Sequence, residues 1–296
     1  ACSTGIHWTK AAQERESMMD SSRKIDQGVF GAMRHVTREI WDNKARIWRL
    51  AKFERKAQQG GTVLGNMWDF LNPALQIFVY WFVFSVGLKM SAMEGNVPYS
   101  IWMMSGILPW FFLNGAMMRS TNSIVSAANM LQNISFPLAA VPAKVVVMEW
   151  IDHLWTMAIL IPVSILCGMK LTWNILFVAY YMVAAFLFLI AFSILTSAID
   201  AVFRDFAQFL NPVLRLLMYV SSVIWSIDGL SPKLRMVMRL NPLTYIIQGY
   251  RDSMLYQGFP HEHWLHGIYF WCFTLALFAV GSMVHCRLRR RFIDVI

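Results

Sequence analysis

The sequence lacks the features that a self-sufficient ATPase, a zinc protein or a soluble domain would show. No segment fits the nucleotide-binding loop GxxxxGK[ST], because the nearest approach, from Gly60 to Gly65, continues with Asn66 where the loop needs lysine. The four cysteines show no CxxC and no paired spacing, which argues against a zinc site or a disulfide framework. Charged residues make up only 15% of the chain, against roughly 25% in soluble domains. These absences predict a membrane protein whose energy comes from another protein or from a gradient.

Long apolar runs take the place of the missing charge. The chain is 57% hydrophobic and 15% aromatic. A hydrocarbon core about 30 Å thick needs about 20 predominantly apolar residues per helix. Six runs of this kind lie at residues 68–88, 99–118, 141–167, 173–199, 209–227 and 264–286. They predict an all-α integral membrane protein with six transmembrane helices.

The apolar runs together form a predicted transmembrane domain at residues 68–286. The other segments predict tails, a cytoplasmic loop and external helices. Residues 1–28 are polar and are expected to be a disordered cytoplasmic tail, and residues 287–296 a basic cytoplasmic tail. Residues 119–137 are too polar to cross the membrane and predict a short helix in a cytoplasmic loop. Residues 228–258 contain apolar stretches too short to span, so we expect re-entrant external helices that are buried in protein or face water.

Residues 29–57 predict an amphipathic helix in the membrane interface. An apolar stripe recurs at helical spacing while cations occupy other positions. The stripe consists of Val29, Met33, Val36, Ile40, Ile47 and Leu50, and the cations are Arg34, Arg38, Lys44, Arg46 and Lys52. We expect the stripe to enter the acyl boundary and the cations to meet anionic headgroups. Packing on a soluble partner is the alternative.

The distribution of lysine and arginine predicts that both termini lie in the cytoplasm. With that orientation nineteen of these residues lie inside and six outside, as the positive-inside rule requires. Basic residues next to a span are typical of contact with the cytoplasmic leaflet, so no nucleic-acid partner is expected.

Three groups of ionisable residues are candidates for chemistry. Glu149, Asp152 and His153 lie within about one helical turn, a spacing that suits metal binding, proton relay or a structural role near Lys144. Arg215 lies inside the fifth run, where an uncompensated arginine costs at least about 2.5–3.5 kcal/mol, so it should face a partner, a subunit contact or a polar conduit. The third group is His261, His263 and His266, which have a metal-like spacing in an external loop. Loop histidines of this kind are more often solvated than liganded.

Several segments together resemble the type-2 ABC transporter permeases that export polysaccharides. Residues 61–86 carry a G-xx-W-xxx-NP core, and residues 99–142 carry an SG-LPW-F run, an ST-SI turn and an FP-closed loop. Residues 203–232 carry an RD loop, and residues 241–258 carry an NPL-x-x-II-x-x-YR signature. Within this family the chain is most similar to the permease of the wall teichoic acid translocator, with O-antigen and capsule exporters close behind.

The resemblance implies the membrane subunit of an ATP-driven exporter in the bacterial cytoplasmic membrane, and not an enzyme in itself. Such permeases pair with a second copy of themselves and with two ATP-binding cassette subunits, which hold the ATP and Mg, so no cofactor is expected in this chain. The substrate would be wall teichoic acid, an anionic glycopolymer linked to a polyprenyl diphosphate. O-antigen or capsular polysaccharide is the alternative, followed by a small hydrophobic drug. The implied ATPase contacts are Ile134, Phe136, Pro137, Arg204 and Asp205.

The resemblance also implies a lateral opening for the substrate between spans one and five. Both spans carry an Asn-Pro pair, which kinks a helix, and the fifth also carries the arginine. Aromatic faces stack on sugars, and cations attract phosphates. The candidate path residues are Trp68, Asn72, Tyr80, Asn211, Arg215, Tyr219 and Trp225, with Trp81 and the external Arg239 and Arg251 as further candidates. Aromatic residues that face lipid or pack between helices are the alternative.

Two other classes of protein predict different features. An intramembrane polyprenyl-phosphate transferase needs paired carboxylates for magnesium on a membrane-facing loop, and only Asp200 with Asp205 comes close. A gradient-driven carrier predicts inverted repeats, and none is seen.

Overall fold

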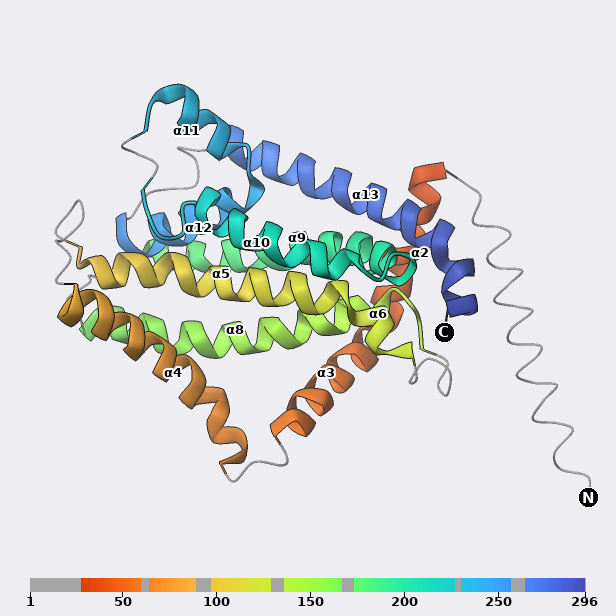
Figure 1. Ribbon diagram of the computed structural model, residues 1–296, viewed down its shortest axis with the longest axis horizontal. Helices are drawn as coiled ribbons and strands as arrows, with labels where there is room; N and C mark the ends of the chain where they lie inside the picture. The colour runs from red at the N-terminus through yellow and green to blue at the C-terminus, as the bar shows by residue number, and fades with distance from the viewer. Residues whose placement is uncertain are drawn as a thin grey trace, which may run out of the picture.

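The computed structural model describes residues 28–59, 64–88, 97–128, 136–166, 173–226, 230–256 and 264–295, and the elements in these ranges are helices without a β-strand (Figure 1). Two helices precede the bundle, α2 (Gly28–Asp42) and α3 (Lys44–Gln59). The bundle then contains η1 (Gly65–Met67), α4 (Trp68–Trp81), η2 (Phe82–Gly87), α5 (Tyr99–Thr121), α6 (Ser123–Ser126), α8 (Ala140–Leu166), η4 (Trp173–Ile175), α9 (Leu176–Val202), α10 (Phe206–Val220), α11 (Pro232–Arg239), α12 (Pro242–Arg251), η5 (Asp252–Tyr256) and α13 (Trp264–Val295). The predicted tail up to residue 27, and Ile134, His261 and His263, lie outside the described residues.

Five helical segments are long and apolar enough to cross a membrane, which confirms an all-α, multi-pass membrane protein. They are Phe70–Gly87, Tyr99–Thr121, Ala140–Leu166, Trp173–Val202 and Trp264–Arg289. The fifth predicted run, at 209–227, is instead α10, which has 15 residues and ends at Val220. At 1.5 Å per residue it reaches about 22 Å, less than the hydrocarbon core. The count of six spans therefore stays a prediction.

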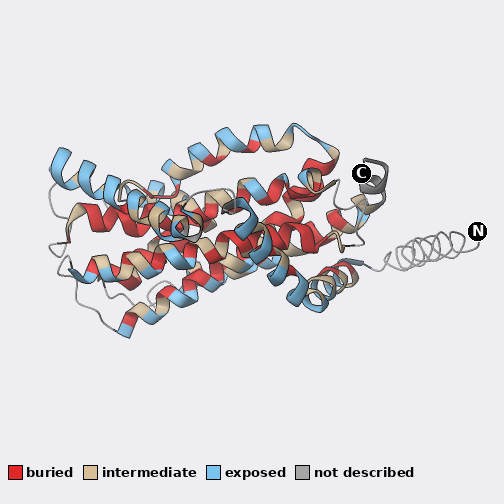
Figure 2. Cartoon of the chain, turned by 90° about the horizontal axis from the view of Figure 1, so that it is seen from below, coloured by how far each residue is buried: buried red, intermediate tan, exposed pale blue. Residues whose placement is uncertain are grey.

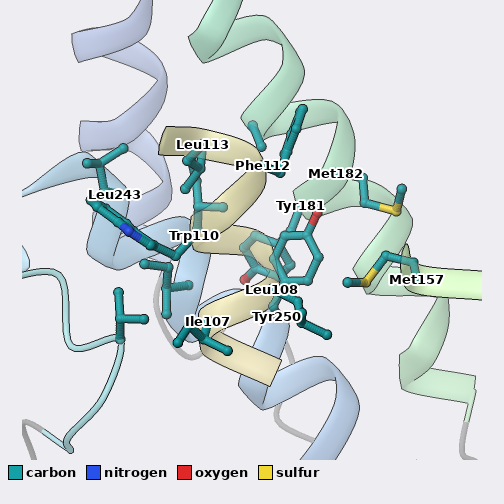
Figure 3. Close-up of a cluster of buried hydrophobic side chains, with 14 of the residues drawn as sticks. Ile107, Leu108, Trp110, Phe112, Leu113, Met157, Tyr181, Met182, Leu243 and Tyr250 are labelled. Atoms are coloured by element: carbon teal, nitrogen blue, oxygen red, sulfur yellow. The ribbon is translucent and has the colours of Figure 1, made fainter. Parts of the chain in front are cut away.

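α5 forms the centre of the bundle. It packs against α4, α8, α9 and α12, and 78% of its most apolar window is buried, against 6% for Phe70–Gly87. Its side chains Leu108 and Leu113 lie in the main core with Tyr181 and Tyr250 (Figure 3). Buried residues accordingly run along the middle of the bundle (Figure 2). α5 is thus the element that positions the others, whereas α4 presents most of its surface outward.

Residues 29–57 form two helices, α2 and α3, rather than one. The break lies at Asn43, whose side-chain amide donates to the carbonyl oxygen of Glu39 at 2.8 Å. α2 packs on α13 and α3 packs on α8, so that Val36 and Ile47 from the predicted lipid-facing stripe are buried against the protein. The outward face instead carries exposed aromatic residues, among them Phe30, Trp41, Trp48 and Phe53. The place of these helices at a membrane surface stays a prediction, but Val36 and Ile47 of the stripe expected to enter lipid are buried against the chain itself, while Val29 is exposed.

The last helix is longer than its apolar run. α13 continues through Cys286, where the sixth run ends, as far as Val295. The basic segment expected as a separate tail is therefore mostly helical.

Short helices fill the segment between α10 and α13. α11 and α12 are followed by η5, and α12 packs on α5 and α9 with Leu243, Ile246 and Tyr250 buried. The side chain of Asn241 caps α12 by accepting the backbone N–H of Leu243 at 3.0 Å. These are the non-spanning helices that the sequence predicts for residues 228–258, within the part of that segment that the structure describes.

Candidate coupling end and substrate path

One end of the bundle brings together the two segments predicted to contact an ATPase. Ile124 of α6, Phe136 and Leu138 lie in one apolar cluster with Ala201 and Val202 at the end of α9. We call this region the α6 end, formed by α6, residues 136–139 and the turn at residues 203–205 (Figure 1). Segments about 70 residues apart in the sequence therefore form one surface at this end.

The predicted contact residues differ in how far they are exposed. Arg204 and Asp205 are exposed on the turn, whereas Phe136 and Pro137 are half-buried. Phe136 packs against the cluster around Val141, so part of its role is internal. Sequence reasoning missed Phe203, which is 66% exposed beside Arg204. An aromatic residue directly before the RD pair was the signal that could have identified it.

The turn at the α6 end is held by the chain itself. The amide of Phe203 donates to the carbonyl oxygen of Ile199 at 2.8 Å, and that of Phe206 donates to Phe203 at 2.9 Å. The buried carboxylate of Asp200 accepts the backbone N–H of Ala207 at 2.9 Å. Asp200 therefore stabilises the turn by binding its backbone. Separately, the described residues contain no group of three or more His, Cys, Asp or Glu placed to hold a metal.

The ionisable residues of α8 each have a partner on a different helix. Glu149 pairs with Arg119 of α5 at 2.7 Å, and Asp152 pairs with Arg55 of α3 at 2.5 Å. His153 is buried, and its Nε2 lies 2.9 Å from the hydroxyl of Tyr250. The residues that the sequence grouped as a metal or relay site therefore join α8 to three neighbours, which favours the structural alternative.

A second ion pair fixes α3 to α8. The ammonium of Lys144, which is almost fully buried, lies 2.5 Å from Oε1 of Glu54. Lys144 thus pairs with α3 and not with the carboxylates of its own helix. Together with Arg55 and Asp152, two pairs of opposite polarity hold the helix that precedes the first span.

α2 is attached to α13 by a small polar cluster. Glu39 lies 3.6 Å from Nδ1 of His35 and 3.4 Å from a guanidinium nitrogen of Arg289. Burial lowers the pKa of His35, with Glu39 opposing and Arg289 adding to the shift. The imidazole is therefore neutral at pH 7, and the charge on Glu39 is balanced by Arg289.

The candidate path residues on α4 lie on its partly open surface. Asn72 is exposed, while Trp68 and Tyr80 are half-buried. The ring of Tyr80 lies 6.4 Å from that of Phe84 and 6.0 Å from that of Phe111 on α5. Tyr80 therefore packs between helices, whereas Asn72 remains open to a ligand or a second subunit.

The candidates on α10 share one exposed face. Asn211, Arg215 and Tyr219 are spaced four residues apart and are all exposed, while Leu210 and Leu214 are buried on the other side. Trp225 donates from Nε1 to the carbonyl oxygen of Tyr219 at 2.9 Å. Arg215 thus lies on an open polar stripe and not inside the core of one chain.

α5 separates the two groups of path residues. α4 packs on α5 and α8, whereas α10 packs on α5 and α9, and the two lie on opposite sides of α5 in Figure 1. Within the part of the chain that the structure describes, α4 and α10 therefore form no substantial interface with each other.

Arg251 has a different environment from the one the sequence suggested. It is 3% exposed and lies 3.7 Å from the centre of the Trp102 ring. Its guanidinium donates to the carbonyl oxygens of Ser222 and Val223 and, at 3.4 Å, to that of Trp102. Because these groups occupy it, Arg251 is not an open ligand for phosphate. Arg239 is half-buried and lines a pocket at the end of the bundle that carries α11.

Known proteins are similar to this chain over most of its length. The family model described as ABC-2 type transporter matches residues 45–255. An O-antigen export system permease protein RfbA from Klebsiella pneumoniae is 24% identical over 246 residues, which are 81% of this chain and 91% of the relative. The protein of that name from Myxococcus xanthus is 24% identical over 222 residues, 74% of this chain and 84% of the relative. Because the family model covers more than half of a chain with several membrane-spanning helices, the protein belongs to the ABC-2 type transporter family.

Proposed function

We propose that this chain is the membrane subunit of an ATP-driven exporter that moves a polyprenyl-diphosphate-linked polysaccharide of the O-antigen type across the bacterial cytoplasmic membrane. The curated relatives are named O-antigen export permeases, which supports the alternative given in the sequence analysis. Their names do not support wall teichoic acid, which was the main substrate expected from the sequence motifs.

The observation that carries the proposal is the surface at the α6 end. The sequence has no nucleotide-binding loop, and membership of the family implies an ATP-binding partner. Phe203, Arg204 and Asp205 are exposed on a turn that the chain's own hydrogen bonds hold in place. Aromatic residues and arginine are enriched at protein interfaces, and Phe203 and Arg204 expose both kinds of side chain here. This surface supports docking of an ATPase subunit.

The exposed face of α10 supports a path for an anionic polymer. Arg215 can attract phosphates, Asn211 can bond hydroxyl groups, and Tyr219 can stack on sugars. This face and the open face of α4 lie on opposite sides of α5, so a path lined by both requires two copies of the chain. The proposed path therefore lies between α10 of one copy and α4 of the other.

Reconstitution with the ATPase partner tests the proposal. Vesicles that contain this chain and the ATPase should move lipid-linked O-antigen-type polymer to the far leaflet when ATP is present. Transport by this chain without the ATPase and ATP would contradict it.

Depletion of the chain in its host tests the substrate. We expect lipid-linked repeating-unit polysaccharide to accumulate on the cytoplasmic side. Accumulation of a polyol-phosphate polymer instead would contradict the O-antigen type and support wall teichoic acid as the substrate.

A further inference from the structure

The charges of α2 and α3 are divided between two sides of these helices. The carboxylates of Glu39 and Glu54 lie toward the bundle, where they pair with Arg289 and Lys144. Among residues 28–58, whose exposure the structure describes, Asp42 is the one acidic residue that is exposed. The exposed cations of the same residues are Arg34, Arg38, Lys44, Arg46, Arg49, Lys52 and Lys56. Seven cations and one carboxylate therefore share the surface that we call the outward face of α2 and α3.

Aromatic rings and cations are interleaved on this outward face. The ammonium of Lys44 lies 4.0 Å from the centre of the Trp41 ring, and that of Lys52 lies 4.8 Å from the centre of the Trp48 ring. Both tryptophans are exposed, as are Phe30 and Phe53. Tryptophan prefers the boundary between lipid and water, because its ring is apolar and its N–H is polar. The face therefore places an interfacial side chain beside a cation at two positions.

The two helices lie at the level where candidate membrane spans begin and end. Ile47 of α3 packs with Ala140, the first residue of α8. Glu39 of α2 pairs with Arg289, which is the last residue of the candidate span Trp264–Arg289. The hydrocarbon core of a bilayer gives way to the headgroup layer at the ends of the spans. The outward face of α2 and α3 is therefore placed at the depth of the lipid headgroups.

The composition of the outward face favours a lipid surface over a protein as its partner. Lysine is depleted in protein–protein interfaces, whereas basic residues next to a span are typical of contact with anionic lipid. Here two of the lysines lie directly over the tryptophan rings. A zwitterionic lipid surface has no net charge to balance seven cations, whereas each anionic headgroup supplies a negative charge. Charge and position together therefore select an anionic lipid surface.

We propose that the outward face of α2 and α3 binds the headgroups of anionic phospholipids such as phosphatidylglycerol. Its lysines and arginines would bind the lipid phosphates, while Trp41 and Trp48 lie in the headgroup layer. The ion pairs with Lys144 and Asp152 hold α3 from the side of α8. Since α3 leads through η1 into α4, lipid on the opposite side would help to fix where the first span begins.

Native mass spectrometry of the purified full chain with defined lipids tests the proposal. Phosphatidylglycerol should be retained roughly tenfold more than phosphatidylcholine, whose phosphate is neutralised by a permanent positive charge. Lys44→Gln combined with Lys52→Gln should lower retention of phosphatidylglycerol by roughly fivefold or more and leave that of phosphatidylcholine unchanged. Asp42→Asn should raise retention of phosphatidylglycerol by roughly threefold, because it removes the exposed carboxylate from this face.

Two matched controls separate the charge of this face from other effects of substitution. Lys44→Arg combined with Lys52→Arg keeps both charges and should retain phosphatidylglycerol as well as the unmodified chain does. Lys233→Gln removes an exposed cation from α11 and controls for a change in the net charge of the whole chain. The gain expected of Asp42→Asn keeps the test decisive where other variants fold poorly, because a misfolded chain does not gain selective lipid binding.

Equal retention of the two lipids by the unmodified chain would overturn the proposal. Equal losses for the glutamine and arginine double variants, or a loss of the same size for Lys233→Gln, would overturn it as well. Displacement of phosphatidylglycerol by inorganic diphosphate, at an ionic strength matched with sodium chloride, would assign the cations to a diphosphate-bearing ligand instead of the lipid surface. The assay needs no ATPase and no polymer, so its outcome is independent of the proposed transport function.

Discussion

The guanidinium of Arg251 lies over the ring of Trp102, 3.7 Å from its centre, and binds the backbone just after the end of α10. The carbonyl oxygens of Ser222 and Val223 belong to an irregular turn in which Ser222 has φ of 60°. Irregular backbone at membrane depth persists only where its polar groups are satisfied. Arg251 therefore supplies the donors that allow α10 to end at Val220, short of a full crossing.

We expect Arg251→Lys to destabilise the chain although it keeps the charge. A single ammonium on a flexible stem cannot replace the planar fork that reaches several carbonyl oxygens and stacks on Trp102. Each buried carbonyl left unpaired costs roughly 1–3 kcal/mol. The measurement is the melting temperature of the purified chain in detergent.

Gly106→Ala should have the same effect from the other side of the contact, because a Cβ at this position would overlap the Arg251 guanidinium. Gly87→Ala is the control, since the nearest atom to its Cβ would be a carbonyl oxygen at 3.8 Å. An unchanged melting temperature in Arg251→Lys and Gly106→Ala would show that the turn is held by other contacts.

The end of α10 is a feature that could not be predicted from the sequence. Hydropathy predicts the start of α5 and both ends of α8 to within one residue, because the apolar runs are bounded by polar or helix-breaking residues. In contrast, the run at 209–227 stays apolar beyond Val220. The group that stabilises the end of α10 is Arg251, about 30 residues later. The residues around Val220 therefore contain no pattern from which this end could be predicted.

The faces of the helices were harder to predict than their positions. The stripe in 29–57 is a valid amphipathic signal, but periodicity does not distinguish lipid from α8 and α13 as the apolar partner. Likewise, the carboxylates of α8 look like one group along the sequence, yet Arg119 and Arg55 approach from different helices. The Asn211, Arg215 and Tyr219 face was predicted as a path candidate, and its exposure leaves that prediction open to test.

Phe203→Asp should weaken docking of the ATPase without unfolding the chain. The side chain is 66% exposed at the α6 end, so a carboxylate there is solvated in the free chain but would lose water if the proposed docking buries this turn. Loss of a central aromatic contact typically costs 2 kcal/mol or more, so we expect roughly a tenfold or larger loss of affinity. Co-purification of the ATPase and ATP-driven transport are the measurements.

Phe136→Asp should behave differently, because this side chain packs against the cluster around Val141 and its charge would also lower the stability of the chain alone. Trp173→Asp serves as the control, since Trp173 is 84% exposed and precedes the first residue of α9, whereas the turn at residues 203–205 follows the last one. Full ATPase binding by Phe203→Asp would remove the turn from the docking surface.

A series at Arg215 separates charge from shape on the α10 face. If the face meets an anionic polymer, transport should fall in the order arginine, lysine, glutamine, glutamate, with glutamate lowest by roughly tenfold or more. The stability of the single chain should change little, because Arg215 is exposed. No group among the described residues would lose an ion-pair partner when Arg215 is replaced. Transport and melting temperature are measured on the same preparations. Equal transport by the glutamine and glutamate variants would exclude a direct contact with phosphates.

The pair between Glu54 and Lys144 should prove necessary for the attachment of α3 to α8. Glu54→Lys would place a second cation against an ammonium that is only 6% exposed. Breaking a buried pair costs roughly 3–5 kcal/mol, and we expect less here because Glu54 is 32% exposed. The reversed pair, Glu54→Lys with Lys144→Glu, should recover most of the lost stability, as a double-mutant cycle measures.

Asp42→Lys makes the same charge change on an exposed position of α2 and should have little effect on stability.

Transport activity of the same variants provides a second measurement for this double-mutant cycle. α3 leads through η1 into α4, so a loose α3 also frees the start of the first span. If the reversed pair restores stability and transport together, the attachment itself is what export needs. If it restores stability alone, the identity of the charges at this position is required as well, which would place Lys144 in contact with the substrate or the ATPase during transport.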